Sequence, residues 1–463
     1  MPLRAKGLPI HCRISNILPN IAPQQKISMY PNLYYVFKDI FGISLPFLKI
    51  VNTFGFFVAI AFLAAAWLLV KEFKRKQAAG IFTYTETTII VGKPAEFSEL
   101  IINFIFGFII GYKFLGLFLV KGAMNNAQDY IGSAQGNFIA GLLTGLLAAG
   151  LKYWDKNKVK LAKPEERSIR IWPSDRVGDM TIIAAVAGFA GAKIFDNLEN
   201  WDRFIQDPIG NLFSRSGLTF YGGLICATLA LWYYFSKKKI SFINVCDVAA
   251  PSLMLAYGLG RIGCQVSGDG DWGIINSAYL VFPSGRLATD VTPQKFDTAM
   301  AMYGNLYVEA GQSYPPPSKA LRAFGGLPDW MFAYTYPHNV NKMGINTTNC
   351  TFDDYCKHLP LAVFPTPLYE IVMALLIFAL LWAIRKKINI PGRLFAIYLI
   401  FNGLERFFIE KIRVNTKYSI FGLHPTQAEL ISSFLVIAGV FLYWYAPKIK
   451  ITLPGKPITE NAT

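Results

Sequence analysis

Arg261, Asp269 and Asp271 lie in a glycine-rich stretch, GRIGCQVSGDGDWG at residues 260–273, that follows directly on the apolar run LMLAYGL. Charged side chains are costly inside a membrane, so they usually face a cavity or a partner and mark functional sites. The density of glycine also suits close approach of the backbone to a ligand. The alternative is an ordinary polar loop that caps a membrane span.

A second group of charges occurs in GLERFFIEKIRVN at residues 403–415. Arg406, Glu410 and Arg413 are spaced i, i+4 and i+7, so on a helix they share one face. An acid between two arginines can hold their planar donor groups at one point, which suits a phosphate. The alternative is a salt-bridged helix end at the outer interface, because such pairs are common on helix surfaces.

Tyr221 precedes Gly222 and Gly223 in the apolar stretch RSGLTFYGGLICATLALWYYF at residues 215–235. Small residues allow close packing of membrane helices, and that alone could account for the two glycines. Taken by itself, Tyr221 is more typical of the aromatic belt at a membrane interface than of a catalytic group.

The composition indicates that these groups belong to a membrane protein. Of the 463 residues, 53% are hydrophobic and only 16% are charged, which is apolar-rich beside an average soluble domain. A formal net charge of +16 could indicate nucleic-acid binding, but the basic residues lie at the ends of apolar runs. The charge therefore fits the Lys/Arg excess of cytoplasmic loops.

Nine apolar segments are predicted to cross the membrane, and the first is uncharged and long enough to span the bilayer core. Basic clusters follow alternate segments, at KEFKRK, KNKVKLAKPEER, KKK, RKK and PKIK. These clusters are expected inside the cell, which places the N-terminus outside and the C-terminus inside. The predicted spans are residues 51–70, 98–120, 136–154, 179–197, 217–236, 243–262, 364–384, 393–412 and 427–446.

This topology puts GRIGCQVSGDGDWG and the long polar segment after it on the outer side. Cys350 and Cys356 lie in that segment, and an oxidising compartment could close them into a small loop. The stretch from Met29 is amphipathic and could lie on the outer surface. The predicted divisions are an outer N-terminal segment at 1–50, a first membrane region at 51–273, a small irregular outer domain at 274–363, a second membrane region at 364–447 and a cytoplasmic tail at 448–463.

The three groups therefore bring arginines, carboxylates and a tyrosine together at the outer leaflet. A soluble substrate would more naturally be met by a pore or a globular domain. An anionic phospholipid head group fits this arrangement better.

The chain resembles the prolipoprotein diacylglyceryl transferase family, bacterial membrane enzymes that attach a diacylglyceryl group to the lipobox cysteine of lipoprotein precursors. The family signature runs Gly-Arg-x-Gly, Asn-Phe and Asn-Gly-Glu and ends in Trp-Gly, and GRIGCQVSGDGDWG is similar but altered. Arg261 matches the signature arginine, and Asp269 stands where the family has glutamate. Cys264 and Ser267 replace asparagines, and one extra residue precedes the closing Trp-Gly pair.

Further motifs follow in family order from residue 51 to about 446. LTFYGGLI is similar to the family's Ser-Phe-His-Gly-Gly-Leu-Ile, with Tyr221 in place of a functional histidine. FPTPLYE resembles Pro-Ser-Gln-Leu-Tyr-Glu and keeps Glu370, while NTFG carries Phe54 where the family has tyrosine. ERFFIEKIR is close to Arg-Phe-x-x-Glu-x-x-Arg and supplies Arg406, Glu410 and Arg413.

The resemblance implies an all-α polytopic membrane protein with a seven-span transferase core, so the two additional predicted spans are an inserted hairpin within residues 76–178. It implies transfer of the diacylglyceryl group of phosphatidylglycerol to a lipobox thiol at the outer leaflet of the bacterial cytoplasmic membrane, the first step of lipoprotein maturation. The expected partners are phosphatidylglycerol, lipobox signal peptides and membrane lipid, without nucleic acid. No metal site and no diffusible cofactor are expected.

The site residues follow from the same resemblance. The catalytic candidates are Arg261, Arg406, Tyr221, Asp269 and Glu410. The candidates for binding phosphatidylglycerol are Arg261, Arg406, Arg413, Gly222, Gly223, Gly273, Asp271 and Glu370.

Each role has a chemical reason. Arginine is permanently charged and bidentate, so Arg261 and Arg406 are assigned to the phosphate with Arg413 in support. A carboxylate must take the thiol proton or fix the arginines, and the sequence leaves Asp269, Asp271 and Glu410 open. Two rival functions also stay open, a non-catalytic binder of lipoprotein signal peptides and a lipid transporter, although no repeat symmetry supports the second.

Overall fold

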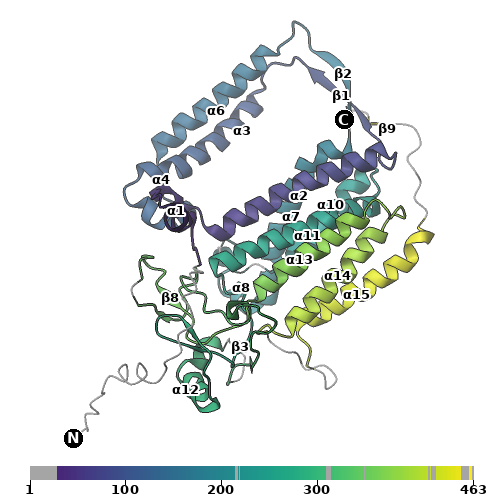
Figure 1. Ribbon diagram of the computed structural model, residues 1–463. Coiled ribbons are helices and arrows are strands. Elements are labelled where there is room, and N and C mark those ends of the chain that lie inside the picture. Colours follow the sequence, from purple (N-terminus) through teal and green to yellow (C-terminus); the bar gives the residue numbers. More distant parts are fainter. Residues whose placement is uncertain are drawn as a thin grey trace.

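The computed structural model describes residues 29–213, 217, 219–308, 314–348, 350–415, 418, 424–449 and 458–460. Figure 1 shows a bundle of long helices, with an irregular domain at one end and a helical hairpin at one side. The predicted all-α polytopic class is confirmed. The predicted N-terminal division at 1–50 lies partly outside the described residues.

Helices occupy all nine positions that were predicted to cross the membrane. Among the described residues, six helical segments are long and apolar enough to do so by length and composition alone. The other three predicted spans, α6, α10 and α14, are helices that each pack along one of these six segments. The helices are α2 (Thr53–Ala78), α3 (Phe97–Ile110), α6 (Phe138–Lys158), α7 (Val177–Glu199), α10 (Phe220–Lys237), α11 (Phe242–Ser267), α13 (Thr366–Ile384), α14 (Arg393–Glu410) and α15 (Gln427–Tyr445).

The bundle is built around α11, which packs against α2, α13 and α14. Met254 of α11, Leu381 of α13 and Leu394 of α14 belong to one buried apolar cluster. α7 pairs with α10, and α15 packs along α14. Because α11 is enclosed by its neighbours, its outer end is held at a fixed place in the bundle.

Ion pairs fasten the helices at the end of the bundle opposite the irregular domain. Lys76 Nζ lies 3.3 Å from Asp247 Oδ2, and Arg385 Nε lies 2.8 Å from Glu72 Oε1. All four side chains are at least largely buried. KEFKRK, predicted to follow the first span on the inner side, is helical, because α2 continues through it; its charges pair with Asp247 of α11 and with Arg385 at the end of α13.

A separate module joins α2 to α7 and corresponds to the predicted inserted hairpin. The strand β1 (Thr85–Val91) leads out to α3, and β2 (Glu165–Ile171) returns from α6. The strands are antiparallel, with Thr85 opposite Ile171, and β9 (Ile458–Glu460) pairs in parallel with β1. This sheet was not predicted, and it lies at the end of the bundle away from the irregular domain (Figure 1), where the basic clusters occur.

The two helices of the module pack through small residues. A Cβ at Gly107 of α3 would lie 2.6 Å from Thr144 O, and one at Gly145 of α6 would lie 2.8 Å from the Phe104 ring. The hydroxyl of Thr144 donates to Gly107 O at 2.8 Å. The helices are therefore close enough for hydrogen bonding between one side chain and the neighbouring backbone. A π-helical turn (Gly111–Leu115), α4 (Gly116–Leu119), η4 (Ala123–Asn126) and α5 (Ala127–Gly132) connect them.

Residues 274–363, here called the outer domain after their predicted side of the membrane, have their own core although little of this segment is regular structure. Cys350 and Cys356 form a disulfide. Its elements are α12 (Pro293–Tyr303), η6 (Gly304–Tyr307), η7 (Asp329–Met331) and the paired strands β3 (Ile275–Asn276) with β6 (Ser318–Lys319), β4 (Leu280–Val281) with β5 (Leu287–Ala288), and β7 (Ile345–Asn346) with β8 (Lys357–His358). Its buried cluster is Met29, Ile275, Phe296, Met300, Tyr307, Tyr334, Tyr336, Leu359, Leu361 and Val363.

Short helices line the outer end of the bundle and the connections. In α1 (Leu33–Phe41) Leu33 and Tyr35 are buried while the charged Lys38 and Asp39 are exposed, so the predicted amphipathic character of this stretch is confirmed. The remaining short helices are η2 (Pro46–Ile50), η5 (Pro173–Arg176), α8 (Trp201–Gln206), α9 (Pro208–Phe213) and η8 (Ala446–Lys448).

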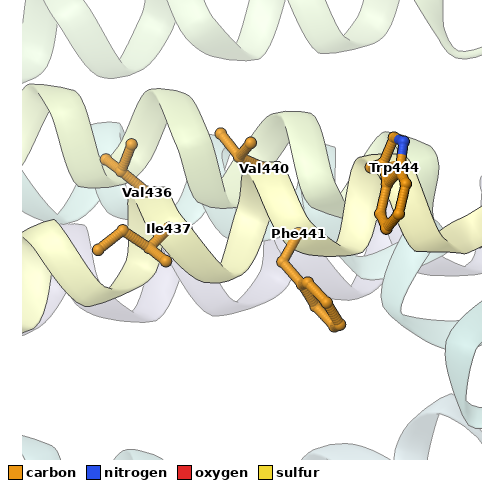
Figure 2. A pocket seen from close by; sticks show the side chains of 5 residues that line it. All are labelled: Val436, Ile437, Val440, Phe441 and Trp444. Atoms are coloured by element: carbon orange, nitrogen blue, oxygen red, sulfur yellow. The ribbon is translucent and has the colours of Figure 1, made fainter.

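The outward face of α15 is apolar, as expected for a helix that meets lipid. A shallow hollow on this face is bordered by aliphatic and aromatic side chains and has almost no polar lining (Figure 2). Such surface fits acyl chains and offers no group for chemistry. The hollow is lined by Val436, Ile437, Val440, Phe441 and Trp444.

Candidate active site

Arg261 projects from the last turns of α11 rather than from a loop. The helix is longer than the predicted span at 243–262, because α11 continues to Ser267 and ends at Gly268, which adopts a left-handed φ of 65°. Gly263 is tolerated in this helix because its bare face meets α2, where a Cβ would lie 3.1 Å from Phe57 Cβ. The turn that follows is therefore short, and it starts one helical turn beyond Cys264.

The second predicted group is only partly on one helix. α14 ends at Glu410, so Arg406 and Glu410 share its face, and Arg406 Nη2 lies 3.1 Å from Glu410 Oε2. Arg413 follows a turn and sits in an extended segment that bridges to Gly273. The three residues converge as predicted, but the helical spacing of Arg413 is not what brings it there.

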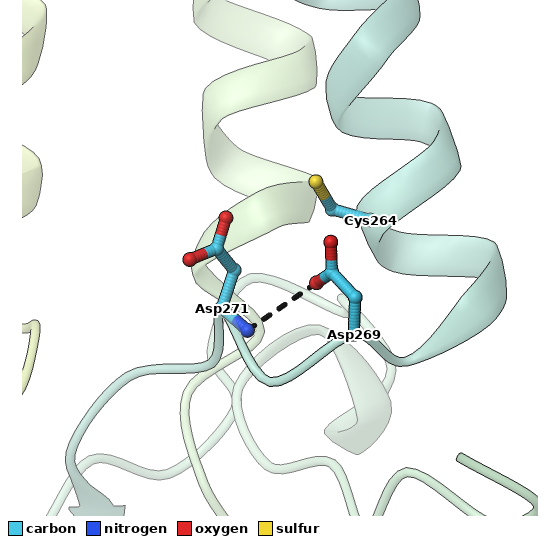
Figure 3. A group of neighbouring side chains, drawn as sticks. All are labelled: Cys264, Asp269 and Asp271. Atoms are coloured by element: carbon cyan, nitrogen blue, oxygen red, sulfur yellow. Dashed lines mark hydrogen bonds between the residues drawn. The ribbon is translucent and has the colours of Figure 1, made fainter. Parts of the chain in front are cut away.

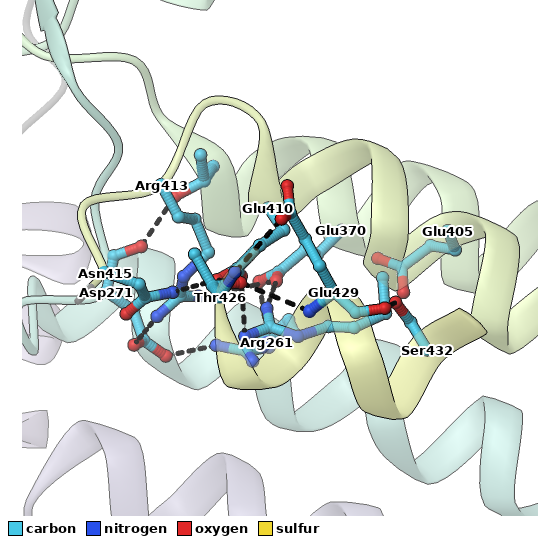
Figure 4. A network of polar contacts seen from close by, with 12 residues as sticks. Arg261, Asp271, Glu370, Glu405, Glu410, Arg413, Asn415, Thr426, Glu429 and Ser432 are labelled. Atoms are coloured by element: carbon cyan, nitrogen blue, oxygen red, sulfur yellow. Dashed lines mark hydrogen bonds and ion pairs between the residues drawn. The ribbon is translucent and has the colours of Figure 1, made fainter. Parts of the chain in front are cut away.

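Glu370, near the start of α13, is the centre of the site. Its carboxylate lies 2.9 Å from Arg261 Nε and 3.5 Å from Nη1 of both Arg406 and Arg413. The side chain is fully buried, with 0% exposure. A buried carboxylate is stable only when it is paired, and here one acid pairs with Arg261 of α11 and with two arginines at and beyond the end of α14. Figure 4 shows Arg261 and Arg413 beside Glu370.

Asp271 lies on the open side of the same arginines. One carboxylate oxygen pairs with Arg261 Nη1, and the other lies 2.7 Å from Arg413 Nη2. The backbone carbonyl of Asp271 accepts from the Thr366 hydroxyl at 2.6 Å, which ties the turn to the start of α13. Arg261 and Arg413 are therefore held between Glu370 behind and Asp271 in front.

Gly273 closes the turn against the segment after α14. A Cβ at this position would lie 2.5 Å from Ile412 O, and Ile274 N donates to that same carbonyl at 2.8 Å. The close approach of the Ile412 carbonyl thus explains why residue 273 is glycine. A contact of Gly273 with phosphatidylglycerol stays a prediction.

Glu410 is almost fully buried and accepts several hydrogen bonds. Thr426 Oγ1 donates to Glu410 Oε1 at 2.7 Å and Asn415 Nδ2 donates at 2.5 Å (Figure 4). The other oxygen, Oε2, lies 3.1 Å from Arg406 Nη2. Thr426 also caps α15 through a capping box with Glu429. Glu410 therefore fixes Arg406 and joins α14 to the start of α15.

Tyr221 lies in the first turn of α10, and its hydroxyl is close enough to Arg406 to share a hydrogen bond. The structure thus brings it to the predicted arginines. Gly222 and Gly223 instead face α7: a Cβ at Gly222 would lie 2.3 Å from Phe195 Cβ, and one at Gly223 would lie 2.9 Å from Gly188 O. The packing interpretation accounts for both glycines, and their predicted contact with phosphatidylglycerol stays a prediction.

Cys264, Asp269 and Asp271 form a small cluster at the outer end of α11 (Figure 3). One ligand atom from each lies within 4.8 Å of the others, a spacing that a metal ion could use. Asp271 already pairs with two arginines, and Arg261 Nη1 lies 3.9 Å from Cys264 Sγ. Two guanidinium groups so close to the donor set repel a cation, so the cluster fits an anion or a thiol better than a metal ion.

The two aspartates of the turn have opposite electrostatic environments. Burial alone would raise the pKa of Asp271, but the charges of Arg413 and Arg261 overcome it and lower the pKa to about 2. Burial, together with the neighbouring Asp271 carboxylate, raises the pKa of Asp269 above its ordinary value. Asp271 is therefore a permanent anion, whereas Asp269 binds a proton more readily.

Residues 139–445, more than half of the chain, match the sequence profile of the prolipoprotein diacylglyceryl transferases. The chain belongs to the prolipoprotein diacylglyceryl transferase family. Curated members are similar along much of their length, and each is named a phosphatidylglycerol–prolipoprotein diacylglyceryl transferase. That of Dehalococcoides mccartyi is 26% identical over 271 residues, covering 58% of this chain and 77% of the relative. That of Enterococcus faecalis is 27% identical over 271 residues, covering 58% and 74%.

The matched range contains every predicted site residue of this transferase family member. It begins within α6, so it includes the second half of the hairpin module and leaves out α2 with the NTFG motif. The boundaries of the insertion therefore stay a prediction. The antiparallel pairing of β1 with β2 supports an insertion, because it returns the chain to the place where it left the bundle.

One buried acid of the transferase site escaped the sequence analysis. Glu405 of α14 is 4% exposed, and Tyr257 of α11 donates to its Oε1 at 3.4 Å, one turn deeper than the arginines. Two signals were available, since Glu405 is an acid in a predicted span and directly precedes Arg406. Thr426 and Asn415 were missed because no spacing rule connects them to Glu410.

Proposed function

We propose that this chain transfers the diacylglyceryl group of phosphatidylglycerol to the lipobox cysteine thiol of prolipoproteins. The observation that carries the proposal is the convergence of Arg261, Arg406 and Arg413 on Glu370, beside the cavity at the outer end of the bundle. Family membership and the names of the relatives support the same reaction.

In this reaction the sulfur of the lipobox cysteine attacks the terminal glyceryl carbon of the diacylglyceryl group. A carbon–sulfur bond forms, the carbon–oxygen bond to the phosphate breaks, and the electron pair leaves with glycerol phosphate. The thiol proton must pass to a base, because the thiolate is the effective nucleophile and an ordinary thiol has a pKa near ~8.5. Negative charge therefore develops on the leaving phosphate, where arginines stabilise it most.

The arginines are fully paired in the structure, so the phosphate must take the place of a resident anion. Glu370 is buried behind them and cannot leave easily, whereas Asp271 lies in a turn beside the cavity. We assign Asp271 as the group that exchanges with the phosphate of the lipid. Arg261 and Arg413 would then bind the phosphate with the fork geometry that Asp271 now occupies.

Tyr221 is assigned an orienting role. A phenol is neutral near pH 7 and cannot act as an ordinary base, but its hydroxyl can donate a hydrogen bond. Placed beside Arg406, it would direct that guanidinium or donate to a phosphate oxygen. Tyr221 would thus stand where the family has a histidine, but it would not accept a proton.

The proposed location is the bacterial cytoplasmic membrane, with the site at the outer leaflet. The site lies at the same end as the disulfide-containing domain, and the basic clusters lie at the other end. This arrangement supports the orientation in which the phosphatidylglycerol and lipobox peptides of the outer leaflet reach the arginines.

Complementation tests the proposal against its two rivals. The gene should sustain lipoprotein maturation in bacteria depleted of their own transferase, and Arg261→Lys at equal membrane abundance should not. A non-catalytic signal-peptide binder and a lipid transporter would both fail to restore maturation. Failure of the wild-type chain in several hosts, despite normal insertion, would contradict the transferase assignment.

A further inference from the structure

The carboxylates of the site differ in whether an arginine holds them. Both oxygens of Asp271 pair with arginines, Glu370 pairs with three, and Glu410 pairs with Arg406 and accepts from two further side chains. In the described part of the chain, Asp269 and Glu405 have no ion pair with a lysine or arginine, and of these two only Asp269 lines the cavity at the outer end of the bundle.

We propose that Asp269 accepts the proton of the lipobox thiol as its sulfur attacks the glyceryl carbon. The inference rests on the proposed function and assigns the base that the sequence left open among three carboxylates. The proton moves to the Asp269 carboxylate, the carbon–sulfur bond forms, and the electron pair of the broken carbon–oxygen bond leaves with glycerol phosphate. The protonated Asp269 then returns its proton to water.

The turn holds the Asp269 carboxylate in one orientation. Its Oδ1 accepts from Asp271 N at 3.3 Å (Figure 3), and its backbone carbonyl accepts from Asn341 Nδ2 of the outer domain at 2.6 Å. Gly268 and Gly270 have φ values of 65° and 102°, a backbone conformation that residues other than glycine rarely adopt. The carboxylate also shares a hydrogen bond with the Cys264 thiol, which shows that a thiol can reach it.

The sulfur atom of Cys264 lies close to both the Asp269 carboxylate and the Arg261 guanidinium, the two groups that the reacting thiol must reach. Cys264 Sγ lies within 4.8 Å of a carboxylate oxygen of Asp269 and 3.9 Å from Arg261 Nη1. A thiol can therefore approach this carboxylate while it remains close to a guanidinium that we assign to the phosphate. An incoming lipobox thiol needs those two neighbours, one for its proton and one for the leaving group.

The cavity beside Asp269 gives the thiol a route from the outer side. It has a volume of about 470 Å³ and extends from Asp269 and Arg413 to Leu306, Tyr307 and Pro316 of the outer domain. Its lining combines polar groups of the turn with apolar groups of the domain. This mixture suits a lipobox peptide that leaves the membrane and presents its cysteine to the turn.

The electrostatic surroundings favour the same role. The titratable or charged groups around Asp269 are Cys264 and Arg261 from α11, Asp271 from the turn and Tyr336 from the outer domain. Burial raises the pKa of Asp269, which brings its basicity closer to the working pH of the reaction.

The test is the pH dependence of transfer by the purified full chain, with phosphatidylglycerol in detergent micelles and a synthetic lipobox peptide. Asp269→Asn should lower kcat at pH 7 by about 100-fold or more, the usual contribution of a positioned base. The difference in kcat between Asp269→Asn and the wild type should become smaller as the pH rises past ~8.5, where the substrate thiol ionises without a base. KM for phosphatidylglycerol should change little, and Asp269→Glu should recover much of the rate.

A matched control is Asp290→Asn in the outer domain, where an exposed aspartate lies 3.7 Å from Lys295; it should keep the wild-type profile. If Asp269→Asn lowers kcat by the same factor at every pH, Asp269 has a structural role and the inference is overturned. A wild-type rate in Asp269→Asn would overturn it as well. Absence of transfer by the wild-type chain would instead contradict the proposed function itself.

Discussion

Arg413 Nη2 lies 2.7 Å from Asp271 Oδ1, so an acid of the chain occupies the place beside this arginine that a lipid phosphate needs. Asp271 lies in the short turn where this chain has one residue more than the family signature. Its other oxygen pairs with Arg261. Both arginines thus already pair with a carboxylate of the chain, and in the proposed function an anionic lipid binds by exchange with this carboxylate.

Asp271→Asn should lower KM for phosphatidylglycerol. The amide can still contact Arg261 and Arg413, but it no longer competes as a charge. Loss of one charge-assisted contact changes binding by about 1 to 1.5 kcal/mol, so KM should fall roughly tenfold. Steady-state transfer at varied phosphatidylglycerol in mixed micelles measures this. A raised KM would show that Asp271 positions the arginines rather than competing with the lipid.

The same substitution should change how stability depends on pH. The pKa of Asp271 is lowered to about 2 by Arg413 and Arg261 against the opposing effect of burial. Its contribution to stability is therefore complete above the unfolded pKa of ~3.9 and is lost as the pH falls towards 2. The Tm difference between wild type and Asp271→Asn should be constant from pH 6 to 5 and should shrink below pH 4. An unchanged difference at pH 3 would contradict the assignment.

Arg261→Lys and Arg406→Lys should each reduce transfer severely, by about 100-fold, while membrane insertion stays normal. Lysine keeps the charge but loses the planar fork, with which Arg261 is assigned to bind the phosphate and Arg406 pairs with both Glu370 and Glu410. Arg385→Lys is the matched control, because Arg385 also pairs with a buried acid, Glu72, but at the opposite end of the bundle. Transfer per folded molecule should be unchanged in the control. Near wild-type turnover in either site variant would make that arginine structural.

Tyr221→Phe should reduce transfer roughly tenfold and leave insertion and lipid binding intact, since only the hydroxyl beside Arg406 is removed. Tyr233→Phe serves as the control, because Tyr233 lies on the exposed face of the same helix. The pH profile of Tyr221→Phe should keep its shape, because an orienting group does not titrate near neutral pH. Full activity would return Tyr221 to the role of an interfacial aromatic.

The orientation of the chain can be tested by thiol labelling in intact cells. A cysteine introduced at Ala320 in the outer domain should react with a membrane-impermeant reagent without permeabilisation. A cysteine at Ser168 in β2 should react only after permeabilisation, because β2 lies at the end of the bundle with the basic clusters. Reversed labelling of the two positions would overturn the topology.

The long helices were predictable because apolar runs and basic flanks are properties of the sequence itself. The end of α11 could not be predicted, because glycines such as Gly263 are typical of loops, and only the packing of α2 against Gly263 accounts for a glycine within the helix. Arg413 was correctly placed in the site, but the helical spacing used to place it was wrong, because α14 ends at Glu410. The pairing of β1 with β2 depends on strands separated by a helical hairpin, which local periodicity does not reveal.

The candidate site was predicted through its charged residues, and the roles of its acids were not. Asp269, Asp271 and Glu410 could not be distinguished by sequence, because their difference lies in which arginines reach them. Glu405 was overlooked although an acid within a span is a signal in itself. The contacts of Gly222 and Gly223 with α7 required the packed structure.

The most direct test of the account follows a labelled diacylglyceryl group from phosphatidylglycerol to a lipobox peptide, using the purified full chain. The label should appear on the peptide cysteine in a thioether bond, with release of glycerol phosphate in equal amount. A peptide with serine in place of the cysteine should remain unlabelled. Peptide and lipid that bind the wild-type chain without transfer of the label would contradict the account and leave a non-catalytic binder.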